Sequence, residues 1–128
     1  MLPAATRLTR REDFATAVRR GRRAGCGSVV VHLARDSDVD AVGLPPRVGF
    51  VVGRTVGGSV VRHRVQRRLR HLMRARLGSL PSGALVVVRA LPASADATSA
   101  TLGGDLDGTL RRLIGAGRPS SAHPGSQR

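Results

Sequence analysis

The chain has 128 residues, a formal net charge of +14 and a sequence pI near 12.0. This length suits one domain with a modest core, and so large an excess of positive charge indicates a polyanionic partner that relieves its self-repulsion. The sequence has no signal-peptide-like segment and no apolar run of the ~20 residues that span a bilayer, so we expect a cytoplasmic protein without a membrane partner.

The first predicted element is a helix over Thr9–Arg20. Thr9 and Glu12 fit a capping box at its start, and a glycine, Gly21, follows its end. Its apolar residues recur at helical spacing and are Phe14, Ala17 and Val18. A basic cluster of four arginines surrounds this end of the helix, before Gly25 and Gly27: Arg19, Arg20, Arg22 and Arg23.

Two strands are predicted next. Ser28–Ala34 contains three consecutive valines, which is typical of a strand. Asp36–Pro46 is polar and contains prolines, so we interpret it as a loop. Arg47–Val52 is a second strand, apolar enough to be buried on both faces of a sheet.

The second half of the chain begins with a glycine-rich connection over Gly53–Ser59. A long helix then starts at Gly58 or Ser59 and runs to about Leu77, where Gly78 follows. The unbroken Leu-Val-Val-Val run predicts a strand over Ala84–Arg89, and leucines at helical spacing predict a last helix over about Ala95–Leu113. Gly115–Arg128 is rich in Gly, Ser and Pro and is expected to be disordered.

The predicted order is helix, strand, strand, helix, strand, helix, with room for an extra short strand. Helices that alternate with strands in this way favour a single small α/β or α+β domain, in which helices pack on one sheet.

The segment Arg47–Arg76 holds nine arginines and no acidic residue. On a helical projection its valines and leucines fall on one side, and most of its arginines fall on the other together with His63 and His71. Arg62 and Arg76 lie nearer the apolar side, and Arg62 could project past the helix end. Such a helix can dock on a sheet and present a cationic face to phosphates.

These residues also carry a family resemblance. The motif consists of Arg47 to Arg54, Gly57-Gly58-Ser59, Arg62-His63-Arg64 and Gln66-Arg67-Arg68. It resembles the signature of the bacterial ribonuclease P protein family, in which a strand and a Ser-Lys turn precede Gly-Asn-Ala-Val, an Arg-Asn-Arg triplet and a Lys-Arg pair. Arg62, Arg64 and Arg67 match this pattern, whereas His63 replaces an Asn and Gln66 replaces a Lys. The similarity covers roughly Arg7 to Leu113.

The resemblance implies an α+β two-layer sandwich over residues 7–114, with residues 1–6 flexible and residues 115–128 disordered. The implied sheet has about four strands, three helices and a left-handed crossover, similar to the second domain of ribosomal protein S5. The implied function is that of a ribonuclease P subunit, which binds the catalytic RNA and the 5′ leader of precursor tRNA and assists endonucleolytic removal of the leader. The Mg²⁺ ions are then held by the RNA, and we expect no catalytic residue, no tightly bound metal and no required protein partner in this chain.

Site residues are carried over from the resemblance in two groups. The RNA-binding residues are Arg54, Arg62, His63, Arg64, Arg67, Arg68 and Arg70. The cleft for the leader is expected to include Phe14, Val18 and Phe50, where a ring could stack on a base. Phe14 and Phe50 also fit ordinary core positions.

Other functions were weighed against this interpretation. The segment from Gly53 to Ser59 lies where a phosphate-binding loop would, but it lacks the lysine that nucleotide hydrolysis needs. The four histidines lie in unlike contexts, and the single cysteine, Cys26, excludes a cysteine-rich metal site, so a self-sufficient nuclease is not supported. The alternative that stays open is a structural RNA-binding protein of the ribosomal type.

Overall fold

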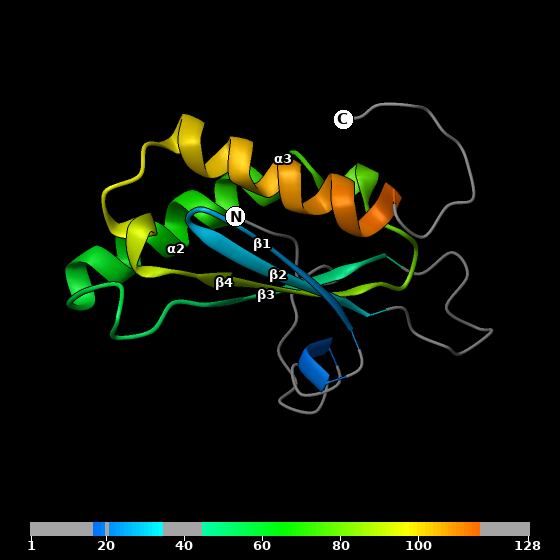
Figure 1. The fold of residues 1–128 in the computed structure, drawn as a ribbon, viewed down its shortest axis with the longest axis horizontal. Helices are drawn as coiled ribbons and strands as arrows, with labels where there is room; N and C mark the ends of the chain where they lie inside the picture. The colour runs from blue at the N-terminus through cyan, green and yellow to red at the C-terminus, as the bar shows by residue number, and fades with distance from the viewer. Residues whose placement is uncertain (1–16, 20, 35–44, 116–128) are drawn as a thin grey trace.

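The computed structural model describes residues 17–19, 21–34 and 45–115. Four strands form one sheet, and they are β1 (Arg22–Cys26), β2 (Val29–Ala34), β3 (Arg47–Val51) and β4 (Leu85–Ala90). Two long helices, α2 (Ser59–Arg74) and α3 (Ser99–Gly115), accompany two short 3-10 helices, η3 (Leu77–Ser79) and η4 (Pro92–Ala95). Residues 17–19 form a helical turn. The predicted α+β domain is confirmed (Figure 1).

Several predicted segments lie outside the described residues. These are most of the helix over Thr9–Arg20, most of the loop over Asp36–Pro46, residues 1–6 and residues 116–128.

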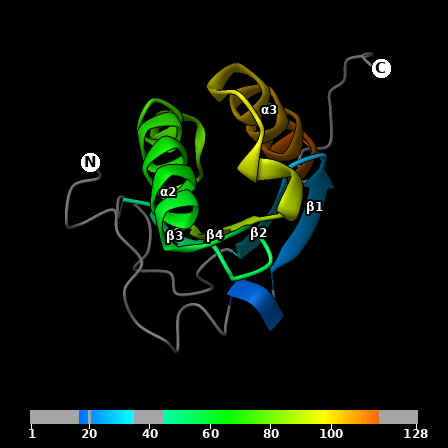
Figure 2. The ribbon, with the colours of Figure 1, turned by 90° about the vertical axis from the view of Figure 1, so that its left-hand side faces the viewer.

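The strands lie in the order β1-β2-β4-β3. β2 pairs antiparallel with both β1 and β4, whereas β3 and β4 are parallel and are connected through α2. In Figure 2, β3 runs toward the viewer, α2 lies above the sheet and β4 lies to the right of β3. This path makes the crossover left-handed, the rare hand for a parallel connection and the hand that the resemblance implied.

The two faces of the sheet are covered differently. Helices α2 and α3 lie side by side on one face, and the helical turn at residues 17–19 lies below the other, which we call the lower face (Figure 2). Because side chains alternate along a strand, Val29, Val31 and Leu33 of β2 join the main core under the helices. On the lower face Ala17 packs in a small cluster with Ala34, Leu85 and Val87.

Strand β1 is the extra strand for which the sequence left room. The segment looked like a basic cluster beside glycines, but Arg22–Cys26 pairs along its length with β2. The hairpin turns at Gly27, which has φ +54°, a left-handed conformation that favours glycine. A Cβ there would also approach the Asp105 carboxylate on α3 to 2.8 Å. Gly27 therefore serves both the turn and the close contact with α3.

The helix boundaries differ slightly from those predicted. Helix α2 ends at Arg74 instead of Leu77, because the chain tightens into η3 at Leu77–Ser79. Helix α3 starts at Ser99 instead of Ala95 because Pro92–Ala95 forms the separate helix η4. The Thr98 hydroxyl then accepts a hydrogen bond from the Thr101 backbone N–H at 3.1 Å, which caps the start of α3.

Candidate nucleic-acid interface

The turn between β3 and α2 positions the start of the cationic helix. Gly57 has φ +156°, and a Cβ there would lie 3.0 Å from the Val61 side chain, so glycine is needed for this approach. Gly58 is the N-cap residue and provides no side-chain cap, and the first turn of α2 contains no acidic residue. The backbone N–H groups of this turn therefore keep their affinity for an anion. Arg54 is exposed in the same turn.

Helix α2 divides into a buried side and a charged side, as its pattern predicted. Val65, Leu69 and Met73 are fully buried against the sheet. The exposed residues on the opposite side are His63, Arg64, Arg67, His71 and Arg74, and the half-buried residues at its margins include Arg62, Gln66, Arg68 and Arg70. The structure thus places six of the seven predicted RNA-binding residues on one helix and the seventh, Arg54, in the turn before it. We call the seven residues together the α2 face.

Two arginines of the α2 face are anchored on the side toward α3. The Arg68 guanidinium donates to the Ala97 carbonyl oxygen at 3.0 Å, and the Arg64 guanidinium donates to the Ala95 carbonyl oxygen at 3.4 Å. A guanidinium carries five N–H donors, so each arginine keeps donors for another partner. These contacts restrict the side chains without neutralising them.

Arg62 and Arg76, the two arginines near the apolar side, behave differently. Arg76 is structural, since its guanidinium forms a salt bridge of 2.7 Å with Asp107 of α3 and donates to the Leu72 carbonyl oxygen. Arg62 is half-buried, and its Nε–H is shielded from solvent without a hydrogen-bond partner. An unsatisfied buried donor is costly, so a phosphate or ribose oxygen at this position would relieve that cost.

No described acid forms a salt bridge with the α2 face, although Asp96 lies between Ala95 and Ala97, whose carbonyl oxygens accept hydrogen bonds from Arg64 and Arg68. The described residues include three acids, Asp96, Asp105 and Asp107, and all lie in or just before α3. The hydrogen bond from Arg76 lowers the pKa of Asp107, and hydrogen bonds from Ser28 lower the pKa of Asp105. Two of the three carboxylates are thus engaged inside the fold.

The lower face of the sheet holds a second group of polar residues. His32 of β2 is only 4% exposed, and neither ring nitrogen has a hydrogen-bond partner. Arg23 of β1 is opposite His32 in the strand register, and Arg89 of β4 is opposite Val30. Burial lowers the pKa of His32, and the positive charges of Arg23 and Arg89 lower it further. The ring is therefore neutral near pH 7 and can both donate and accept a hydrogen bond.

Of the residues predicted for a leader cleft, Val18 and Phe50 lie on opposite faces of the sheet. Val18 is 48% exposed in the helical turn below the lower face. Phe50 is half-buried and packs against the main core on the other face, which agrees with its alternative interpretation as a core residue. Phe14 lies outside the described residues. Sequence reasoning did not select His32, although its alternation with Val30 and Ala34 along β2 indicates that it shares their face.

The described part of the chain has neither a group of metal ligands nor a membrane-spanning helix. Within residues 17–19, 21–34 and 45–115, no three His, Cys, Asp or Glu side chains group as ligands for a metal ion. The helices of the same residues include none that is long and apolar enough to cross a membrane.

The chain is similar in sequence to known proteins over most of its length. The sequence pattern of the family described as Ribonuclease P matches residues 2–114. A Ribonuclease P protein component of Streptomyces griseus is 61% identical over 121 residues, which cover 91% of this chain and 98% of that protein. Another from Mycobacterium avium is 50% identical over 113 residues, which cover 88% of this chain and 95% of that protein.

Solved structures are similar in fold. The RNase P protein from Thermotoga maritima is 25% identical with a TM-score of 0.69, and the match covers 84% of this chain and 96% of that chain. The RNase P protein of Staphylococcus aureus has a TM-score of 0.70 at 20% identity, and the match covers 84% of this chain and 94% of that chain. At that identity the likeness concerns the fold alone.

Proposed function

Because this chain belongs to the ribonuclease P protein family, we propose that its α2 face holds the catalytic RNA while the lower face of its sheet guides the 5′ leader of precursor tRNA. The family places the chain as a subunit of the endoribonuclease ribonuclease P, in which the RNA subunit is its partner and carries the catalysis. The relatives described above are ribonuclease P proteins, and nothing in the structure favours the ribosomal alternative.

The observation that carries the first part of the proposal is the row of cationic side chains along α2, none of which forms a salt bridge with a described acid. Folding brings these charges together on one side of a helix whose other side is fully buried. Phosphate oxygens accept bidentate hydrogen bonds from guanidinium groups, and the uncapped start of α2 adds backbone N–H donors. The partly unsatisfied Arg62 would gain an acceptor in the complex.

The residues of the lower face support the second part of the proposal, that this face guides the 5′ leader. A single-stranded leader offers phosphates to Arg23 and Arg89, which flank the buried His32. The ring nitrogens of His32 lack a hydrogen-bond partner and are shielded from solvent, so a base edge or a ribose hydroxyl would satisfy them once a local rearrangement exposes the ring. Val18 lies exposed in the neighbouring helical turn and offers an apolar contact.

Magnesium belongs, in this proposal, to the RNA subunit. The α2 face carries only cationic and neutral groups, which repel a divalent cation. The described carboxylates Asp105 and Asp107 are engaged with Ser28 and Arg76. The protein would act by screening phosphates and by positioning RNA, in the cytoplasm where precursor tRNA is processed.

Reconstitution tests the proposal. Purified protein is added to the cognate ribonuclease P RNA at low Mg²⁺, and cleavage of a precursor tRNA is followed with time. We expect the protein to stimulate release of the leader, and we expect a variant with Arg64→Ala and Arg67→Ala to stimulate less. Stimulation that is equal for the wild type and this variant would contradict the assigned role of α2.

A further inference from the structure

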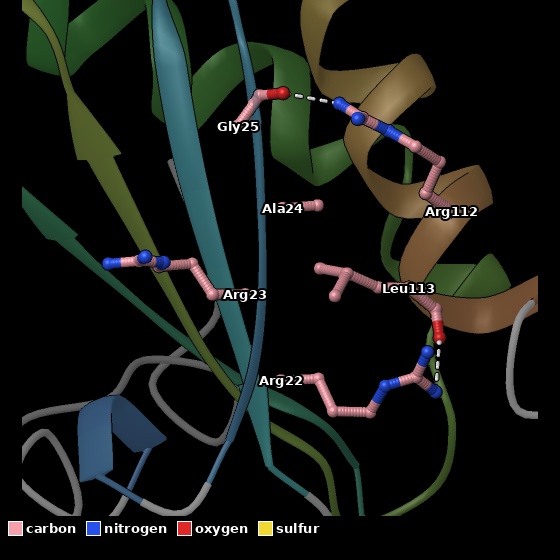
Figure 3. Close-up of a pocket in the computed structure, with 6 residues that line it drawn as sticks. All are labelled: Arg22, Arg23, Ala24, Gly25, Arg112 and Leu113. Carbon is pink, nitrogen blue, oxygen red and sulfur yellow. Dashed lines mark hydrogen bonds between the residues drawn. The ribbon is translucent and has the colours of Figure 1, made fainter.

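A second cationic surface lies at the sheet edge farthest from β3. A groove of about 700 Å³ runs between β1 and the last turns of α3, and it is lined by Arg22, Arg23, Ala24, Gly25, Arg112 and Leu113. Ala24 and Leu113 lie between the two arginine side chains that cross toward the opposite element (Figure 3). The strand order places β1 and β3 at opposite edges of the sheet, so this groove is separate from the α2 face.

The two crossing arginines are held in place. Arg22 of β1 donates to the Leu113 carbonyl oxygen at 3.4 Å, near the end of α3, and Arg112 of α3 donates to the Gly25 carbonyl oxygen on β1. Both side chains remain exposed, and neither forms a salt bridge with a described residue. Since a guanidinium has five N–H donors, each keeps most of them for an external acceptor.

The arginines of β1 connect this groove with the lower face. Arg22 and Arg23 are consecutive, so they point to opposite faces of the sheet. Figure 3 shows Arg22 reaching toward α3 while Arg23 points away from it, and Arg23 is opposite His32 in the strand register. Positive charge therefore continues around the β1 edge, from the lower face into the groove.

We infer that the groove binds phosphates of the 5′ leader, at nucleotides farther from the cleavage site than those on the lower face. This inference rests on the proposed function of the lower face and extends it around the sheet edge. A single strand suits the position because β1 is an edge strand, and because Gly25 adds no side chain to obstruct its approach. The described lining residues include no aromatic ring and no acid, so recognition is through the backbone and independent of sequence.

A double variant, Arg22→Gln with Arg112→Gln, tests the inference in the reconstituted holoenzyme. Gln removes the charge but keeps an N–H donor for the two carbonyl oxygens, so the contact between β1 and α3 can persist. Thermal unfolding of the protein checks that it does. The variant with Lys at both positions keeps the charge, and Arg111→Gln controls for the loss of one surface charge on α3, because Arg111 is exposed outside the groove lining.

The measurement is the Kd of holoenzyme for precursor tRNAs with leaders of graded length and for tRNA without a leader. We expect the Gln double variant to raise Kd by about tenfold for long leaders and to leave Kd unchanged for short leaders. The Lys variant and the Arg111→Gln control should match the wild type.

Three results would overturn the inference. One is a ratio of variant to wild-type Kd that does not change with leader length. Another is an equal loss of affinity for tRNA without a leader, which would assign the groove to the body of the tRNA. The third is weaker binding of the RNA subunit, which would assign the groove to that RNA. The proposed function fails separately, if the wild-type protein gives no leader-dependent gain in affinity at any length.

Discussion

Helices α2 and α3 lie side by side on the same face of the sheet (Figure 2), yet they use their charges in opposite ways. Both bury apolar residues completely, Leu69 on α2 and Leu106 on α3 among them. The acids of α3 point to partners within the fold, since Asp107 binds Arg76 and Asp105 binds Ser28. The arginines of α2 have no described acid as a partner.

This difference between the helices indicates that the charges of α3 stabilise the fold, whereas those of α2 are available for binding. Buried residues of both helices hold the sheet, and the carboxylates of α3 add contacts that fix the β1–β2 turn and the end of α2. The exposed charges of α2 add nothing comparable to the isolated fold. Their arrangement therefore indicates an external anion, and variants of the two helices should separate the two effects.

The largest expected effect comes from the shared core. Leu69→Ala on α2 and Leu106→Ala on α3 each remove a fully buried side chain, and each should lower the free energy of unfolding by about 2–5 kcal/mol. Urea unfolding measures both. A neutral result for either variant would show that the two helices do not contribute alike to the core.

The next effect should appear in binding alone. Replacing Arg64 and Arg67 with Ala should raise the Kd for the RNA subunit by about tenfold or more, since each removes charge-assisted phosphate contacts. Both side chains are exposed, so the free energy of unfolding should change by less than about 0.5 kcal/mol per residue. Arg111→Ala on α3 is the control for the loss of one exposed arginine, and a loss of affinity as large as that from one α2 arginine would remove the distinction between the helices.

A smaller effect on stability alone is expected for α3. Asp105 accepts hydrogen bonds from the Ser28 backbone N–H at 3.0 Å and the Ser28 hydroxyl at 2.5 Å. Asp105→Asn should lower the free energy of unfolding by about 1–2 kcal/mol without weakening RNA binding.

The pH dependence gives a further check on Asp105. Because its pKa is lowered in the folded state, its contribution is complete above the ordinary value of about 3.9 and is lost as pH falls through the folded pKa. The difference in stability between wild type and Asp105→Asn should therefore shrink in acid. A difference that stayed constant would contradict this account.

The smallest effect concerns His32 on the lower face. Its pKa is lowered by burial and by Arg23 and Arg89, so the unfolded chain binds a proton more readily than the folded one. Stability should fall as pH decreases below the ordinary pKa of about 6.5, and the fall should end below the folded pKa. Urea midpoints between pH 7.5 and 5.5, compared with those of His32→Gln, measure this. If the urea midpoint changed equally with pH in the two proteins, the protonation of His32 would not be coupled to folding.

Local patterns in the sequence predicted most of the fold. The valine runs of β2 and β4 and the amphipathic spacing of α2 are strong signals, and all three elements were found near their predicted bounds. Strand β1 carried no such signal, because its sequence Arg-Arg-Ala-Gly-Cys lacks β-branched residues. Its structure depends on pairing with β2 across the turn at Gly27 and on contacts with α3. The contacts with α3 join residues far apart in the sequence, so no local pattern predicts them.

The candidate site was predictable in part for the same reason. The α2 face is consecutive in sequence, so helical periodicity was enough to group its charges. The lower face combines Arg23, His32 and Arg89 from three strands, and only the strand order and register bring them together. The acid that pairs with Arg76 is likewise distant in sequence, at Asp107. The sequence therefore could not distinguish the structural role of Arg76 from the RNA-binding role of the neighbouring arginines.

The central claim is that the uncompensated charge of α2 meets RNA phosphates. The most direct test is the slope of log Kd against log salt concentration for the RNA subunit, measured with wild type, Arg64→Ala with Arg67→Ala, and Arg111→Ala. We predict that the double variant flattens the slope by about one unit for each arginine removed, while Arg111→Ala leaves it unchanged. A double variant with the wild-type slope would show that this side of α2 does not touch phosphate.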